Sequence, residues 1–267
     1  MSVQMDSATM PLKTAPRNAA YLHRYNSPNP RRLHIKMYLF PYAGGSAGIF
    51  RNWPTYFDDS YELVGIQLPG RGSRMGEPAQ VDYRVLVRDI TEAILSDHQG
   101  VRFALFGHSM GALLAHQVAI ELAKRGSAQP ESLFLSGRKA PHLPVQRQPV
   151  ATMTDADFVA ELHRLEGTPK ALLDDVELMQ LLLPTIKADF ILLDLWMANT
   201  SPAPETASLS LPIYCMVGRR DAHCGAADAA AWQAYTHGML EVLQYNGGHF
   251  FLQTQEAQVV RDIRDRL

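Results

Sequence analysis

The sequence is poor in cysteine and in unbalanced charge. Its 267 residues include 2 cysteines, too few for the disulfide framework of a small secreted domain. No Cys/His spacing resembles a structural zinc site, so no metal is expected. The 25 basic and 27 acidic side chains nearly cancel, which argues against a nucleic-acid-binding protein. The fold must therefore depend on its own apolar core.

Targeting and membrane signals are also missing. The first twenty residues contain no continuous apolar stretch, so no secretory signal is predicted. The most apolar later run, from Phe190 to Ala198, is short and is broken by Asp194, so no membrane span is expected. Because 46 % of the residues are hydrophobic and 19 % are charged, disorder and coiled coils are excluded. We expect a monomeric, cytoplasmic globular protein.

Short apolar runs alternate with helical patterns along most of the chain. The predicted strands are His34–Phe40, Tyr61–Gln67, Arg102–Phe106, Ser132–Ser136, Pro212–Val217 and Leu240–Gln244. The predicted helices between and after them are Tyr83–Leu95, Met110–Lys124 and Gln255–Leu267. This alternation predicts an α/β fold with a mostly parallel central sheet and helices on both faces. Ligands bind such sheets at the carboxyl ends of the strands.

Two segments depart from the alternation. Residues 1–32 contain four prolines and end in a basic pair, which predicts a loosely packed N-terminal arm before one domain at 33–267. At about 141–204 the strands stop, and helical patterns cover Asp155–Arg164 and Asp175–Ala198. We interpret this region as a helical lid inserted into the domain.

A nucleophilic serine is predicted within Gly107–Gly111, which reads GHSMG. The pattern G-x-S-x-G is typical of a sharp strand-to-helix turn that exposes a serine hydroxyl. Here a strand runs directly into the pattern and an unbroken helix follows, so Ser109 is the candidate. The pattern occurs again around Ser46, but a proline and glycines separate that site from its strand, and Pro54 interrupts the next helix. Ser46 is therefore predicted to be a turn residue that lines the site.

A serine nucleophile needs a base, and the base needs an acid that fixes its tautomer. His249 lies between the last strand and the last helix, a position from which it can reach the turn. Asp221 follows the strand before it. The chain order Ser109, Asp221, His249 is the order expected for this fold. Asp228 is the rival acid, but its alanine-rich surroundings indicate a solvated helix cap.

Other histidines fit the role of base less well. His108 lies inside the turn and faces the wrong way, and His116 is two helical turns further on and is expected to be packed. His142, at the start of the lid, is predicted to line the pocket.

An oxyanion hole requires two backbone N–H groups. One is expected from Met110, which follows the nucleophile, and the other from the loop after an early strand. The sequence PYAGG occupies that loop, and its glycines allow close backbone approach. Ala43 is the predicted second donor.

Six separated motifs resemble, in the same order, those of the type II thioesterases that accompany nonribosomal peptide and polyketide synthases. They read FPYAGGSAGIFRNW, LPGRGSR, GHSMGALLA, LFLSGRKAPHL, GRRDAHC and GGHFFL. The resemblance runs from about Leu33 to the C-terminus. It implies an α/β-hydrolase fold in which Ser109, Asp221 and His249 form the triad, while Met110 and Ala43 supply the oxyanion amides.

The resemblance also implies the substrate. Members of the family hydrolyse acyl or aminoacyl groups from the phosphopantetheine arm of carrier proteins, which restores stalled antibiotic or siderophore assembly lines. The phosphopantetheine belongs to the substrate, so no cofactor is expected. The residues by themselves indicate only acyl transfer to serine and then to water. A general esterase or acyl-CoA hydrolase, a transacylase and a non-catalytic carrier-binding protein therefore stay open.

Some motif residues have no assigned chemistry. The lid segment Lys187–Phe190 reads KADF and resembles a recurring lid motif, in which Asp189 is expected to be a surface or capping carboxylate. Arg71 could anchor its loop through a charge-assisted hydrogen bond. The basic residues Arg31, Arg32 and Lys36 could meet an acidic carrier, but we interpret them as scattered surface charges.

Overall fold

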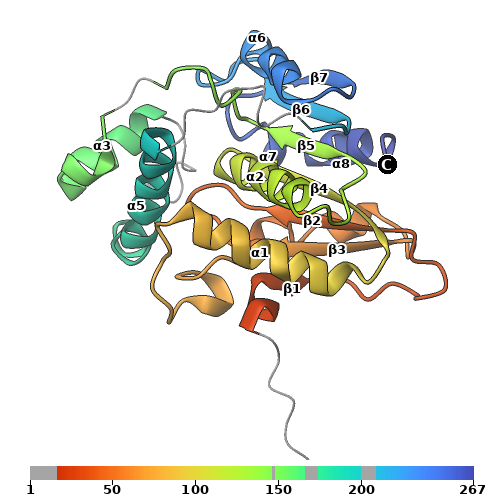
Figure 1. Ribbon diagram of the computed structural model, residues 1–267. Helices are drawn as coiled ribbons and strands as arrows, with labels where there is room; N and C mark the ends of the chain where they lie inside the picture. Colours follow the sequence, from red (N-terminus) through yellow and green to blue (C-terminus); the bar gives the residue numbers. More distant parts are fainter. Residues whose placement is uncertain (1–16, 146–147, 166–173, 200–208) are drawn as a thin grey trace, which may run out of the picture.

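The computed structural model describes residues 17–145, 148–165, 174–199 and 209–267. In these residues one sheet has seven strands in the order β1-β3-β2-β4-β5-β6-β7 (Figure 1). The strands are β1 Leu22–Arg24, β2 Ile35–Phe40, β3 Tyr61–Ile66, β4 Arg102–His108, β5 Leu133–Ser136, β6 Ile213–Gly218 and β7 Leu240–Tyr245. Every neighbouring pair is parallel except β1 and β3. The predicted mostly parallel sheet is confirmed.

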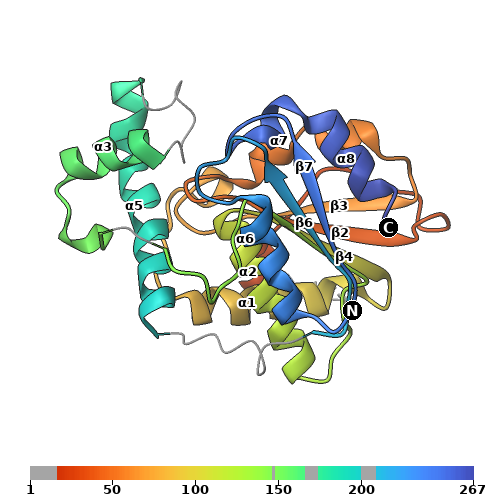
Figure 2. The ribbon, with the colours of Figure 1, turned by 90° about the horizontal axis from the view of Figure 1, so that it is seen from above.

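Helices cover both faces of the sheet (Figure 2). One face carries α1 Tyr83–His98, α2 Met110–Lys124 and α6 Ala226–Ala230, and the other carries α7 Phe251–Thr254 and α8 Glu256–Arg264. Strand side chains alternate between the two cores, so Tyr38 and Phe40 enter the first, and Met37 and Leu39 enter the second. This period of two explains why the strands are apolar throughout, since both faces of the sheet are buried.

The lid forms part of the connection between β5 and β6. Its described helices are α3 Asp155–Leu165 and α5 Val176–Asn199, which lie beside one end of the sheet in Figure 1. Both predicted lid helices are confirmed, whereas 146–147, 166–173 and 200–204 of the predicted lid lie outside the described residues. No helix in the described part of the chain is long and apolar enough to cross a membrane.

The prediction of a loose N-terminal arm is wrong for residues 17–26. Tyr21 is buried, and its carbonyl accepts the Gln67 N–H at 2.8 Å. The strand β1 pairs with β3, and the Asn26 side chain bonds both the Tyr61 carbonyl and the Leu63 amide beyond it. These bonds occupy backbone groups that an edge strand would otherwise expose. Residues 1–16 of the predicted arm lie outside the described residues.

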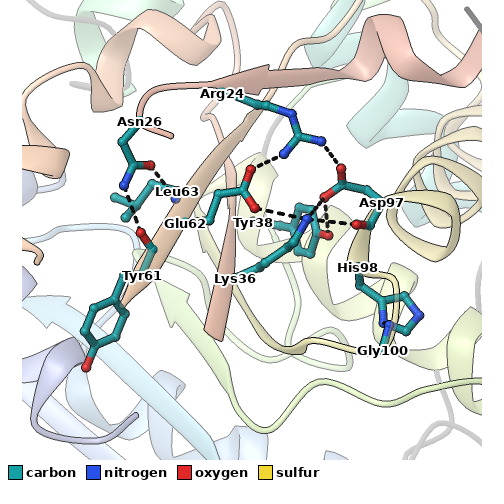
Figure 3. Close-up of polar contacts among 10 residues, drawn as sticks. All are labelled: Arg24, Asn26, Lys36, Tyr38, Tyr61, Glu62, Leu63, Asp97, His98 and Gly100. Atoms are coloured by element: carbon teal, nitrogen blue, oxygen red, sulfur yellow. Dashed lines mark hydrogen bonds and ion pairs between the residues drawn. The ribbon is translucent and has the colours of Figure 1, made fainter. Parts of the chain in front are cut away.

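A buried polar cluster holds β1 against the sheet (Figure 3). Arg24 pairs with Glu62 and Asp97, and Lys36 Nζ lies 3.0 Å from a carboxylate oxygen of each. The Tyr38 hydroxyl donates to Asp97 at 2.7 Å. Burial alone would raise the pKa of Asp97, but the hydrogen bonds from Tyr38 and Lys36 bring it below its ordinary value. Lys36 is 6 % exposed, so it belongs to this cluster and not to a surface that could meet a carrier.

We expect Asp97→Asn to lower the free energy of unfolding by about 3 kcal/mol, because it leaves two cations facing one carboxylate in a buried site. Urea denaturation at pH 7 measures the change. The matched control is Glu131→Gln, which breaks an exposed pair with Arg102 and should cost less than about 1 kcal/mol.

The difference between the wild type and this variant should shrink in acid. A depressed folded-state pKa means that the carboxylate contributes fully above its unfolded pKa of about 3.9, and that this contribution is lost as the pH falls through the folded-state value. Equal stability of the two proteins at pH 7 would show that the cluster holds no net interaction energy.

Candidate active site

Ser109 lies at the turn between β4 and α2 in a strained conformation. Its φ is 55° and its ψ is −112°, and among the described residues Gln99 is the only other non-glycine with a positive φ. Such a backbone costs about 1–3 kcal/mol and persists only where the surroundings impose it. Here the Ser109 amide donates to the Ser136 carbonyl of β5 at 2.7 Å. The predicted strand-to-helix turn is present.

Glycines make this turn possible. A Cβ atom on Gly107 would lie 2.1 Å from the Gly111 carbonyl oxygen. A Cβ atom on Gly111 would lie 2.2 Å from the Phe40 carbonyl oxygen at the end of β2. Both atoms are backbone and cannot move aside, so any side chain at either position would force the first turn of α2 away from the sheet.

The second G-x-S-x-G match has a different structure. Ser46 is extended, with φ −110°, and its Oγ accepts the Gly48 N–H at 3.2 Å, which caps the 3-10 turn Ala47–Phe50. The prediction of a turn residue is confirmed. Its expected place beside the site is wrong, since Ser46 is not among the described residues that line the cavity.

The structure brings His249 and Asp221 together after β7 and β6. His249 Nδ1 lies 2.8 Å from Asp221 Oδ2, and because a carboxylate only accepts, the ring nitrogen carries the hydrogen. This leaves Nε2 as the basic atom. The other oxygen, Oδ1, accepts the His223 N–H at 2.8 Å. Burial alone would raise the pKa of Asp221, but the His249 hydrogen bond and the nearby imidazole charge lower it below its ordinary value.

Ser109, Ala43 and His249 line one cavity of about 420 Å³ at the carboxyl end of the sheet. The described residues contain no hydrogen bond between the Ser109 hydroxyl and His249, whose Nδ1 is bonded to Asp221. On the lid side of the cavity, α5 contributes the apolar residues Phe190, Leu193 and Met197, and α3 contributes Arg164. The spacing of the α5 residues by three and four positions places them on one helix face.

The backbone amides of Met110 and Ala43, the two predicted oxyanion donors, have no acceptor in the described residues. Met110 begins α2, where the first N–H groups have no intrahelical partner. In the loop after β2, the Gly44 and Gly45 amides are already bonded, to Asp189 at 2.7 Å and to the Tyr42 carbonyl at 2.9 Å. The Ala43 amide, like that of Tyr42 before it, makes no hydrogen bond in the described residues, and its role as an oxyanion donor stays a prediction.

The other acidic and histidine residues considered for the site have different surroundings. Asp228 accepts the Gly225 N–H at 2.9 Å and caps α6, as predicted. Burial lowers the pKa of His116 to about 3, so this packed ring stays neutral. His142 stacks on Tyr235, and the prediction that it lines the pocket is wrong for the described residues. No group of three or more potential metal ligands occurs within the part of the chain that the structure describes.

Sequence reasoning missed the position of Asp189. It is 1 % exposed and forms a bidentate ion pair with Arg71, in which Arg71 Nη2 lies 2.7 Å from Asp189 Oδ1. The expected surface or capping carboxylate is therefore wrong, and the anchoring hydrogen bond foreseen for Arg71 is confirmed. The KADF motif was the available signal, but its partner is 118 residues away in the chain.

Known proteins are similar to this chain over most of its length. A family model described as thioesterase domain matches residues 36–267. Thioesterase PikA5 of Streptomyces venezuelae is 34 % identical over 243 residues, covering 89 % of this chain and 84 % of that protein. The chain therefore belongs to the thioesterase family, whose members act as hydrolases on thioesters.

Two solved structures are similar to this chain in fold. The RedJ thioesterase from the prodiginine biosynthetic pathway in Streptomyces coelicolor has a TM-score of 0.81 at 28 % identity and covers 100 % of this chain and 98 % of its own. The type II thioesterase BorB from the borrelidin biosynthetic cluster has a TM-score of 0.80 at 28 % identity, with 92 % and 97 % covered. The predicted α/β-hydrolase fold and the resemblance to type II thioesterases are confirmed.

We expect Gly111→Ala to destabilise the protein by about 3 kcal/mol, since its methyl group would overlap the Phe40 carbonyl. Gly76→Ala is the matched control, because a Cβ atom there would meet nothing within 4 Å beyond its chain neighbours, and a change below about 0.5 kcal/mol is expected. Chemical denaturation measures both. A fully stable Gly111→Ala would mean that the strand and helix are less tightly apposed than described.

Proposed function

We propose that this chain is a stand-alone type II thioesterase that hydrolyses acyl or aminoacyl thioesters on the phosphopantetheine arm of carrier proteins in nonribosomal peptide or polyketide synthesis. The observation that carries the proposal is the placement of a strained serine at a cavity that it shares with a histidine paired to a buried carboxylate. Family membership and the synthase-associated relatives support the substrate class.

The first step is acylation of Ser109. His249 Nε2 removes the hydroxyl proton while Oγ bonds to the thioester carbonyl carbon, and the Met110 and Ala43 amides stabilise the negative oxygen. The carbon–sulfur bond then breaks. The histidine returns its proton to the sulfur, and the thiol leaves on the arm of the carrier.

The second step releases the acid. A water molecule gives a proton to the same histidine and attacks the acyl carbon, and the ester bond to Ser109 breaks as the proton returns to Oγ. Asp221 stays ionised throughout, because its lowered pKa keeps it a carboxylate at neutral pH. It holds the tautomer that leaves Nε2 free and stabilises the imidazolium.

We expect Ser109→Ala to remove essentially all turnover while carrier binding is retained, because only the nucleophile is lost. Intact-mass analysis of an acetyl-loaded carrier measures turnover. Ser46→Ala is the matched control. It should keep turnover within about twofold, since it removes only one exposed capping hydrogen bond, from the Gly48 amide to Ser46 Oγ. If Ser46→Ala is the inactive variant, the choice between the two serine motifs is wrong.

Asp221→Asn should lower kcat about 10⁴-fold, as an amide in this position favours the wrong histidine tautomer. Asp228→Asn, which alters only the cap of α6, should leave kcat within about twofold. Steady-state kinetics with the acetyl-loaded carrier compares the two variants, and equal losses would count against Asp221 as the histidine's partner.

The substrate class is tested by giving the same acetyl group on coenzyme A in parallel. Faster unloading of the carrier supports the proposal. Equal or faster cleavage of acetyl-CoA would indicate a general acyl-CoA hydrolase or esterase. A protein that binds the carrier, but in which a fluorophosphonate does not label Ser109, would be a non-catalytic accessory.

A further inference from the structure

We infer that Asp189 is a positioning residue through which the lid helix α5 fixes the loop that carries the Ala43 amide. The inference rests on the proposed function, since it assigns that amide to the oxyanion hole. It gives the KADF motif a physical role that its sequence does not suggest.

Two backbone amides of the loop after β2 are bonded, one to a local acceptor and one to a distant acceptor. Gly45 bonds back to Tyr42, whereas the Gly44 N–H donates to Asp189 Oδ2 at 2.7 Å, across 145 positions of the chain. Gly44 has a φ of +78°, a conformation that glycine adopts at little cost. The position of the neighbouring Ala43 amide therefore depends on a carboxylate carried by the lid.

The carboxylate itself cannot move freely. Both of its oxygens are bonded by Arg71, which is 2 % exposed, and Arg71 Nε also donates to the Pro69 carbonyl at 3.2 Å. A buried pair of this kind has no water to replace a lost partner. Asp189 is thus held between two loops, one after β2 and one after β3.

Neighbouring residues of α5 contact the same loops. The Thr185 hydroxyl donates to the Gly70 carbonyl at 2.9 Å. A Cβ atom on Gly44 would lie 2.7 Å from Ile186 Cγ1, so the helix packs directly on this glycine. Positions 185 and 189 are one helical turn apart and share a face.

The same helix also lines the cavity that Ser109 and His249 share. Phe190, next to Asp189, lines the cavity together with Leu193 and Met197. Lys187 bonds Asp155 at 2.7 Å and the Met153 carbonyl at 3.1 Å, and so connects α5 to the rest of the lid. An acyl group that displaces α5 would therefore displace the anchor of the oxyanion loop. The fit of the acyl group should accordingly affect kcat as well as KM.

The test separates the effect of losing the hydrogen bond from Gly44 to Asp189 from the effect of losing the ion pair between Asp189 and Arg71. Asp189→Leu removes both and leaves the buried Arg71 without a carboxylate partner, so this variant should also be unstable. The double variant Arg71→Met with Asp189→Leu replaces the pair by apolar side chains, which is often neutral for stability, but still leaves the Gly44 amide without its acceptor. Thr185→Val is the matched control, since it removes a buried bond from α5 to a loop without touching Gly44.

We expect the double variant to unfold at a urea concentration near that of the wild type, with kcat about 100-fold lower on the acetyl-loaded carrier and KM within about threefold. This is the range for a displaced group or a lost oxyanion donor. Thr185→Val should keep kcat within about threefold. Labelling of Ser109 by a fluorophosphonate, whose phosphonyl oxygen occupies the oxyanion hole, should slow by a similar factor in the double variant.

Wild-type kcat and labelling rate in a folded double variant would overturn the inference while leaving the proposed function intact. An equal loss of kcat in Thr185→Val would also overturn it, because lid docking in general would then be responsible. If the fluorophosphonate labels Ser109 of the wild type but the wild type does not unload the carrier, the proposed substrate is wrong. The labelling rates of the variants then still decide the role of Asp189.

Discussion

The close apposition of three backbone segments at the strand-to-helix turn is the constraint on which the rest of the site depends. The first turn of α2 lies against the end of β4 through Gly107 and against the end of β2 through Gly111. This contact imposes the positive φ of Ser109, leaves the Met110 amide without an internal partner, and defines where the loop after β2 begins. Ser109 and the amides of Met110 and Ala43 are thus all positioned by this contact.

His249, Asp221 and the lid lie on other segments of the chain. His249 and Asp221 follow adjacent parallel strands, β7 and β6, and the carboxyl ends of neighbouring strands necessarily meet at one edge of the sheet. Their 2.8 Å hydrogen bond is therefore a consequence of strand order. The lid is different, because no strand places it. It is held by side chains, above all by the buried pair of Arg71 and Asp189.

Buried ionic groups thus have two distinct uses in this molecule. The cluster around Asp97 joins the N-terminal strand to the sheet at a site remote from the cavity, and it is balanced by two cations and two carboxylates. The Arg71 pair joins a lid helix to two active-site loops. The Arg71 pair is closed to water, whereas the Arg24 side chain of the Asp97 cluster is 46 % exposed and can be solvated if its pairs break.

The sequence by itself determined the alternation of strands and helices, the serine turn, and the order in which Ser109, Asp221 and His249 follow their strands. These features are local, since periodicity, glycine spacing and position after a strand are each contained within a few neighbouring residues. The tertiary structure alone decided the paired strand β1 within the expected loose arm, the burial of Lys36 and the partner of Asp189. Each of these depends on contacts between residues 26 to 145 positions apart. Such contacts leave no periodic pattern in the chain, because only the folded packing brings their charges together.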